Sequence, residues 1–449
     1  MTATILCALA FAVTYWAGKR SLGLGVVSLL ACGYFYGILR ANLLGFSYFL
    51  FDAALLGVYL SQWRELADPG DVKRLAWLRL WVALLVLWPI LLIFMPFQPI
   101  MISLVGFRGN ALFIPMALLG ARLRGKDIVS TSVGLACLNL VALAFGGAEY
   151  FLGLQNFYPY NASTALIFGS EDVAGGFHRI PAIFVNAHSY GGTTVATLPF
   201  LLGSWRQSPN YKVRVLVLFG IAAALLGVLL SATRLNFILA TAMTALTISF
   251  GRIRTTGYIA FTLLIAAVLW VAMTNERLQR FMSLSDTEYV ENRISGSLNR
   301  GFFEILLEHP MGNGLGGGGT SIPYFLEGQV RNPISMENEY ARILAEQGVV
   351  GLMLWLGFIA WFLSCFQNIF AKGPWATGRR LAWSFSVLAL GTGLIGTGLF
   401  TAIPGTAILV LGMGWTAAVG LPDVLDKRDL VLSKAAGLPR LRPRPEYTL

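Results

Sequence analysis

Residues 212–250 read KVRVLVLFGIAAALLGVLLSATRLNFILATAMTALTISF. The chain enters apolar sequence after Lys212 and Arg214, turns at residues 231–234, and returns through a second apolar run. Each run approaches the ~20 residues that a helix needs to cross a bilayer. This stretch therefore predicts two membrane-spanning helices joined by a tight turn.

The same pattern recurs along the whole chain. Hydrophobic residues make up 56% of its 449 residues and charged residues only 12%, which excludes a soluble domain. The sequence predicts an all-α, polytopic integral membrane protein with about 12–13 transmembrane helices. The apolar segments lie at roughly 2–17, 21–39, 43–60, 75–95, 101–120, 127–145, 182–203, 212–231, 233–250, 254–273, 343–366, 380–399 and 401–420.

The basic residues indicate how these helices are threaded. Threading the segments alternately in and out places all seven lysines on one face, and ten arginines without a lysine on the other. Because cytoplasmic loops are enriched in basic residues, the lysine face is predicted to be cytoplasmic, with the N-terminus outside and the C-terminus inside. The outer arginines work against this bias and are candidates for binding an anion. They are Arg40, Arg108, Arg179, Arg234, Arg277, Arg280, Arg293, Arg300, Arg331 and Arg342.

Two outer connections, 146–181 and 274–342, are long, and they divide the chain. Long loops are usually functional or disordered. The second should contain a helix over about 299–309, because Phe302, Phe303, Leu306 and Leu307 form one stripe. The predicted parts are membrane helices in 1–145, an outer loop over 146–181, membrane helices in 182–273, a large outer loop over 274–342, membrane helices in 343–420, and a basic cytoplasmic tail over 421–449.

Polar residues near the outer face are the candidates for chemistry. Arg234 should lie near headgroup level, where a bound anion would offset the cost of its charge, although it could also anchor to lipid phosphates. Arg179 precedes the predicted span 182–203. Asp52 lies within a span and is either functional or a hydrogen-bonded carboxyl. His188 enters a span in a polar stretch and could line a cavity.

Glu337 and Glu339 precede the predicted span 343–366. A carboxylate at the mouth of a membrane cavity could act as a general base, whereas the alternative is a pair of acids favoured by the helix dipole. The four cysteines fall within spans and are interpreted as packing residues. No metal, cofactor or nucleic acid is expected. Membrane lipids are expected partners, since the basic tail could touch anionic headgroups.

Two further motifs resemble those of the O-antigen ligase and polymerase superfamily. The large loop ends in HPMGNGLG at residues 309–316, and the following span is entered through ENEYARILAEQGVVGL at residues 337–352. The turn at 231–234 and the Arg179…Phe184…Asn186 stretch are also similar to the family's pattern. The resemblance covers about residues 175–355.

The resemblance implies a glycosyltransferase of the bacterial inner membrane whose active site faces the periplasm. The members transfer glycans from an undecaprenyl diphosphate carrier to an acceptor, so both are implied partners. The family's diphosphate-binding arginines correspond to Arg179 and Arg234, and a third corresponds to either Arg293 or Arg300.

Glu337 stands where the ligases have His. This difference favours a polymerase of lipid-linked repeat units, with Glu337 as the catalytic base and His188, Asn338 and Glu339 as candidates for the acceptor cavity. A chain-length regulator protein is a conceivable partner. Two alternatives remain: a ligase that transfers glycan to lipid A-core or protein, and a non-enzymatic flippase of lipid-linked glycans. The concentration of charge outside disfavours the flippase.

Overall fold

The computed structural model describes residues 2–43, 47–66, 75–161, 163–170, 177–208, 210–250, 302–318, 324–334, 338–370, 375–396 and 398–418, with a few single residues between 259 and 336. In these ranges all regular secondary structure is helical, and no β-strand occurs. The fold class predicted from the sequence, all-α, is confirmed.

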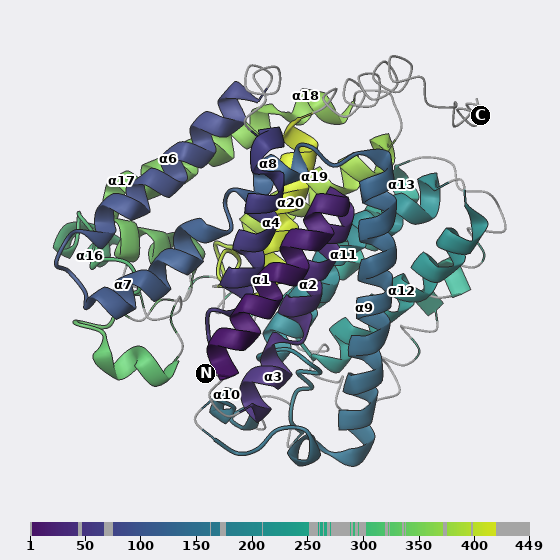
Figure 1. Cartoon of the computed structure of the whole chain (residues 1–449), viewed down its shortest axis with the longest axis horizontal. Coiled ribbons are helices and arrows are strands. Elements are labelled where there is room, and N and C mark those ends of the chain that lie inside the picture. Colours follow the sequence, from purple (N-terminus) through teal and green to yellow (C-terminus); the bar gives the residue numbers. More distant parts are fainter. Residues whose placement is uncertain are drawn as a thin grey trace.

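Figure 1 shows how the described helices are arranged. They are α1 (Thr2–Arg20), α2 (Leu22–Tyr34), α3 (Tyr36–Asn42), α4 (Leu50–Leu66), α6 (Ala76–Ile93), α7 (Ile100–Phe107), the π-helical turn η1 (Arg108–Leu112), α8 (Met116–Gly120), α9 (Gly125–Leu152), η2 (Leu154–Asn156), α10 (Ala165–Phe168), α11 (Ala187–Gln207), α12 (Tyr211–Leu230), α13 (Arg234–Ser249), α16 (Phe302–Glu308), η5 (Tyr324–Gln329), α17 (Glu339–Ser364), α18 (Phe366–Ile369), α19 (Ala376–Thr392) and α20 (Gly405–Ala417).

Several of these helices suit a multi-pass membrane protein. Among the described residues, six helical stretches are long and apolar enough to cross a bilayer: α1, α6, α7 to α8, α9, α12 and α17. A seventh is obtained if α2 and α3, which meet at a bend of 40°, count as one span. The coarser prediction of a polytopic membrane protein is therefore supported.

The predicted number of 12–13 spans stays a prediction. The other predicted segments do form helices, α4, α11, α13, α19 and α20, but these are shorter or more polar. Helix α4 has 17 residues and carries Arg64 and Glu65 near its end, whereas α20 has only 13 residues. The predicted span at 254–273 lies mostly outside the described residues.

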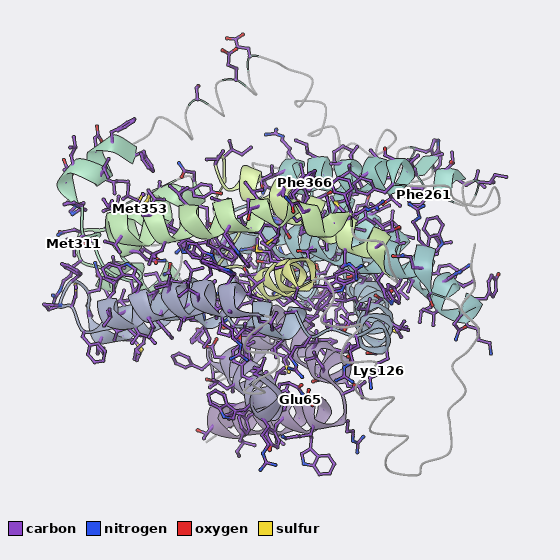
Figure 2. The ribbon with its side chains drawn as sticks, turned by 90° about the horizontal axis from the view of Figure 1, so that it is seen from above. Glu65, Lys126, Phe261, Met311, Met353 and Phe366 are labelled. Carbon is purple, nitrogen blue, oxygen red and sulfur yellow. The ribbon has the colours of Figure 1, made fainter. Side chains whose placement is uncertain are left out.

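Helix α11 lies at the centre of the bundle. It packs against α9, α12, α13, α19 and α20, and it is buried along almost its whole length. This position explains its many Ser, Thr and Gly residues, because small residues let neighbouring backbones approach closely. Helices α6, α7, α16 and α17 lie together on one side (Figure 1). In the perpendicular view, Met311 and Met353 lie toward one side of the molecule and the buried Phe261 lies toward the other (Figure 2).

Contacts between distant connections define two ends of the bundle. Helix α9 has 28 residues and is therefore ~42 Å long, so its two ends lie on opposite sides of the bundle. At its first end, which we call the lysine end because Lys19 and Lys126 lie in the helix ends there, three pairs meet. They are Gly23 N with Asp127 Oδ1 (3.0 Å), Arg122 Nη2 with Glu65 Oε2 (2.9 Å), and Gly378 N with Gln207 Oε1 (2.9 Å).

The opposite end, which we call the arginine end, gathers the connections predicted to be outside. Four hydrogen bonds join them: Ile38 N with Ile183 O (3.1 Å), Arg40 Nη2 with Ser163 O (3.0 Å), Ile180 N with Leu230 O (3.3 Å), and Glu339 N with Gly393 O (2.8 Å). The described connections thus cluster at two ends, and the threading of the whole chain and its orientation in a membrane stay predictions.

Candidate functional site

Arg179 and His188 form the first part of the candidate site. Arg179 lies in the segment before α11 and is only 7% exposed, whereas His188 is the second residue of α11 and is exposed. Arg179 Nη1 donates to His188 Nε2 at 2.7 Å. Because a guanidinium group can only donate, Nε2 of His188 is the acceptor in this contact.

Four hydrogen bonds fix the backbone between Arg179 and His188. Ile180 N donates to Leu230 O, and Ala182 N donates to Glu149 Oε2 at 3.0 Å. The hydroxyl of Tyr158 donates to the carbonyls of Ala182 and Phe184. Ala182 has φ 50°, a left-handed conformation that costs free energy for a residue other than glycine. The surrounding contacts therefore hold this segment in one conformation and position Arg179.

Glu149 and Tyr158 are the polar groups that support this segment. Glu149 lies near the end of α9 and is 1% exposed, and Tyr158 is buried in the following loop. Burial, together with the nearby Glu149 carboxyl, raises the pKa of the Tyr158 hydroxyl well above its ordinary value. Tyr158 therefore stays protonated and remains a donor to the two carbonyls.

Arg234 begins α13, directly after the turn that the sequence predicted. It is half-buried, and the preceding Thr233 is the N-cap residue of the helix. The turn is tied together by hydroxyls, since Ser231 Oγ lies 2.9 Å from Thr233 Oγ1, which also accepts from Asn236 Nδ2 at 3.0 Å. The partial positive charge at the helix N-terminus adds to the charge of the arginine.

The turn before Arg234 packs against the beginning of α11. A Cβ atom added at Gly191 would lie 2.5 Å from both Ser231 Oγ and Thr233 Oγ1, so only glycine permits this approach. Gly191 comes three residues after His188, about one helical turn. Arg179, His188 and Arg234 are thus brought together, beside the N-terminal ends of two contacting helices.

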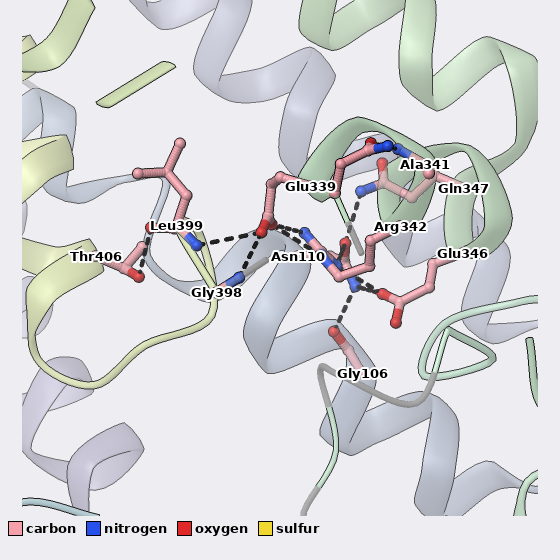
Figure 3. A network of polar contacts seen from close by, with 11 residues as sticks. Gly106, Asn110, Glu339, Ala341, Arg342, Glu346, Gln347, Gly398, Leu399 and Thr406 are labelled. Atoms are coloured by element: carbon pink, nitrogen blue, oxygen red, sulfur yellow. Dashed lines mark hydrogen bonds and ion pairs between the residues drawn. The ribbon is translucent and has the colours of Figure 1, made fainter. Parts of the chain in front are cut away.

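A buried polar network at the start of α17 forms the second part of the site (Figure 3). Arg342 is fully buried between two acids: its Nη2 lies 2.7 Å from Glu339 Oε1, and its Nη1 lies 2.8 Å from Glu346 Oε2. Asn110, in the π-helical turn η1, accepts from Arg342 Nη1 and from Gln347 Nε2, both at 2.8 Å. Single π-helical turns are often found at functional sites.

Glu339 joins this network to the connection between α19 and α20. Its Oε2 accepts from Gly398 N at 2.7 Å and from Leu399 N at 3.2 Å, as Figure 3 shows. The same connection reaches α13, because a Cβ atom at Gly396 would lie 3.7 Å from Leu235 Cδ2. Leu235 follows Arg234 directly, so the α17 network and the first part of the site are neighbours.

The glycine-rich run closes over the network. The described part of this run, residues 312–318, is buried and tightly turned, and Gly312, Gly314 and Gly316 have φ between 81° and 82°. Asn313 N donates to Ala345 O, and Val349 N donates to Pro310 O at 2.9 Å. The second bond is possible because α17 is kinked at Gly348, which has φ 68°.

The structure gives Asn338 and Glu339 partners within the protein. Asn338 is the N-cap residue of α17 and accepts from Ala341 N at 2.7 Å, and Glu339 is fully buried in its ion pair. These contacts fasten the start of α17, and a part in the acceptor cavity stays a prediction for both residues. The predicted base Glu337 and the predicted loop arginines Arg293 and Arg300 lie outside the described residues.

Other outer arginines also find partners inside the protein. Arg108 Nη1 lies 3.7 Å from Asp52 Oδ2 and donates to Tyr48 O at 2.9 Å. Asp52 is thus an ion-pair partner rather than an isolated acid. Arg331 Nη1 donates to Pro96 O at 3.4 Å. Anion binding by the outer arginines, Arg179 and Arg234 among them, stays a prediction.

The sequence interpretation missed three residues of the site: Asn110, Glu149 and Glu346. Asn110 and Glu346 lie within predicted spans, Glu149 lies in the predicted outer loop 146–181, and all three are at most 1% exposed. An ionisable residue inside a membrane segment is by default a functional candidate, and this signal was available for Glu346, inside the predicted span 343–366. Among the described residues, no three His, Cys, Asp or Glu side chains are grouped to hold a metal ion.

Comparison with models of known protein families and with curated proteins finds no match to this chain.

Proposed function

We propose that the chain is a membrane glycosyltransferase that polymerises oligosaccharide repeat units carried on undecaprenyl diphosphate. Its active site would face the periplasm at the arginine end, and the enzyme would lie in the bacterial inner membrane. One observation carries the proposal: Arg179 and Arg234, which the family resemblance assigns to diphosphate binding, lie beside the N-terminal ends of α11 and α13, which pack together.

The proposed donor site binds the diphosphate by charge and hydrogen bonding. Guanidinium groups donate two parallel hydrogen bonds to phosphate oxygens, and helix N-termini offer backbone N–H groups and partial positive charge. Because Arg179 is held by His188 and by a fixed backbone segment, its orientation is set before a ligand arrives. Such prearranged donors stabilise the negative charge that develops on a departing diphosphate.

The proposed reaction is a single displacement. The acceptor hydroxyl attacks the anomeric carbon of the donor sugar, the bond from this carbon to the phosphate oxygen breaks, and undecaprenyl diphosphate leaves. Glu337 accepts the hydroxyl proton, and the anomeric configuration inverts. Glu337 immediately precedes Asn338 and Glu339, whose contacts hold the start of α17 in place. The leaving group is already activated, so the mechanism uses neither a nucleotide nor a metal.

The surface glycan of a deletion strain tests this function. If the chain is a polymerase, deletion removes long glycan chains and leaves the acceptor capped with a single repeat unit. If it is a ligase, deletion removes all capping while lipid-linked polymer accumulates. A normal distribution of chain lengths in the deletion strain would contradict both functions. Complementation with the wild-type gene is the control.

A further inference from the structure

Helix α16 presents three chemically different faces. Ile305 is 5% exposed and packs into the core, whereas Phe303 and Leu307 are 75% and 81% exposed. Glu304 and Glu308 are also exposed. Since successive residues are ~100° apart around a helix, the two exposed apolar side chains share one flank and the two acids share the next. Contact with water alone does not account for these faces, because two large apolar side chains are exposed beside two acids.

The apolar flank adjoins the surface of α17 that faces lipid. The chain after α16 is joined to α17 by the hydrogen bond from Val349 N to Pro310 O. Exposed apolar residues of α17 begin at the next position, with Val350 at 42% and Met353 at 62%. Met311, after α16, is 45% exposed and lies at the same edge of the molecule as Met353 (Figure 2). Helix α16 therefore lies where the apolar surface of a membrane-spanning helix ends.

We propose that α16 lies in the outer interface of the bilayer, with Phe303 and Leu307 among the acyl chains and Glu304 and Glu308 in water. A lipid–water interface offers an apolar and an aqueous environment side by side, which is the arrangement that the two exposed flanks require. This inference is independent of the proposed enzymatic function.

The size of the apolar flank favours lipid over a protein partner. A stable protein interface buries ~800 Å² on each partner. Aromatic side chains bury ~150–250 Å² each, and even if all three were that large, Phe303, Leu307 and Met311 together would supply ~450–750 Å², which is less than that area. Contact with lipid requires no minimum apolar area, because Phe303 and Leu307 would only extend the exposed apolar surface of α17. The helix would fix the depth at which the loop 310–318 meets the start of α17.

Site-specific fluorescence tests this placement. Cys7, Cys32, Cys137 and Cys365 are replaced by alanine, and single cysteines are introduced by Phe303→Cys and Leu307→Cys, each labelled with an environment-sensitive fluorophore. The matched controls are Glu304→Cys and Glu308→Cys, which lie on the same helix and are also exposed. The proteins are placed in nanodiscs of phosphatidylethanolamine and phosphatidylglycerol, and quenching by a lipid-borne nitroxide is compared with quenching by aqueous iodide.

The proposal predicts opposite patterns on the two flanks. Labels at 303 and 307 should be quenched severalfold more by the lipid-borne nitroxide than the controls, and severalfold less by iodide. Equal iodide quenching at all four positions would overturn it. Shielding of 303 and 307 from both quenchers would also overturn it and would indicate coverage by protein instead.

Hydrogen exchange gives a second readout in the chain with its native cysteines. If lipid holds α16, the double substitution Phe303→Ser and Leu307→Ser should increase amide exchange over 302–308 severalfold in nanodiscs, and Glu304→Ser with Glu308→Ser should not. Unchanged exchange in the first variant would contradict the anchoring.

Discussion

Arg234 is half-buried at the first position of α13, so its charge lies partly within the protein rather than wholly in bulk water. Lysine would preserve this charge but not the planar fork that pairs with two phosphate oxygens. Binding of a diphosphate therefore requires arginine at this position. Anchoring to lipid headgroups could be provided by arginine or by lysine.

Arg234→Lys should lower polymerisation strongly while the protein is still made and inserted. Loss of one charge-assisted hydrogen bond is worth ~1.5–3 kcal/mol, which corresponds to a fall of about 10- to 100-fold. The measurement is the initial rate of polymer formation at equal amounts of purified protein. Arg331→Lys, at an exposed arginine of the same end, is the matched control and should retain its rate. Wild-type activity in the Arg234→Lys enzyme would mean that charge alone suffices.

Glu149 acts on the site through the backbone, and two substitutions separate its roles. Glu149→Gln keeps an oxygen that accepts from Ala182 N, whereas Glu149→Leu leaves this buried N–H without a partner. Such a loss costs ~1–3 kcal/mol of stability. If Glu149 positions Arg179, the Glu149→Leu variant should also show a raised KM for the lipid-linked donor. The Glu149→Gln variant should have a KM close to that of the wild type. A leucine variant with lower thermal stability but an unchanged KM would reduce Glu149 to a purely structural role.

At the scale of elements, α17 holds the two parts of the site together. Its first turn is fixed by Asn338, and Glu339 holds the connection between α19 and α20 through two backbone N–H groups. Arg342 balances the charge of Glu339 and Glu346 in a place that water does not reach. The kink at Gly348 then lets the glycine-rich run cover the network.

Arg342→Met should prevent stable folding, because it leaves two buried acids without their cation. Breaking a buried ion pair by removing one partner costs ~3–5 kcal/mol. The thermal midpoint of the purified protein, followed by size-exclusion chromatography after heating, measures this loss. Adding Glu339→Gln and Glu346→Gln to Arg342→Met removes the uncompensated charge and should recover part of the midpoint. A single Arg342→Met variant as stable as wild type would mean that the network contributes little to the fold.

At the scale of the whole molecule, the lysine end and the arginine end are predicted to lie on opposite sides of a membrane. Reporter fusions after residues 126, 212 and 372 should report the cytoplasm, and fusions near 160 and 320 should report the periplasm. The reason is the excess of basic residues in cytoplasmic loops. A cytoplasmic signal from 320 would invert the orientation and remove the proposed chemistry from the periplasm.

Most of the helical fold could be predicted from the sequence, because apolar runs of this length have few stable conformations other than helices. The break between α2 and α3 and the π-helical turn at Arg108 could not, since both interrupt runs that look continuous. The positions of Arg179 and Arg234 at one end followed from alternate threading. The ion pair between Arg342 and Glu339 did not, because the sequence interpretation treated them as separate outer charges.

The most direct test of the proposed function is ladder formation by the purified protein. The full chain in detergent is incubated with lipid-diphosphate-linked repeat units and a metal chelator, and the products are separated by size. A polymerase with an arginine-lined donor site predicts a ladder of products that differ by one repeat unit, in the presence of the chelator. Glu337→Gln should slow the ladder by ~10²–10⁴-fold, the usual worth of general-base assistance. Absence of any ladder from correctly folded wild-type protein, supplied with its native repeat unit, would contradict the proposed function.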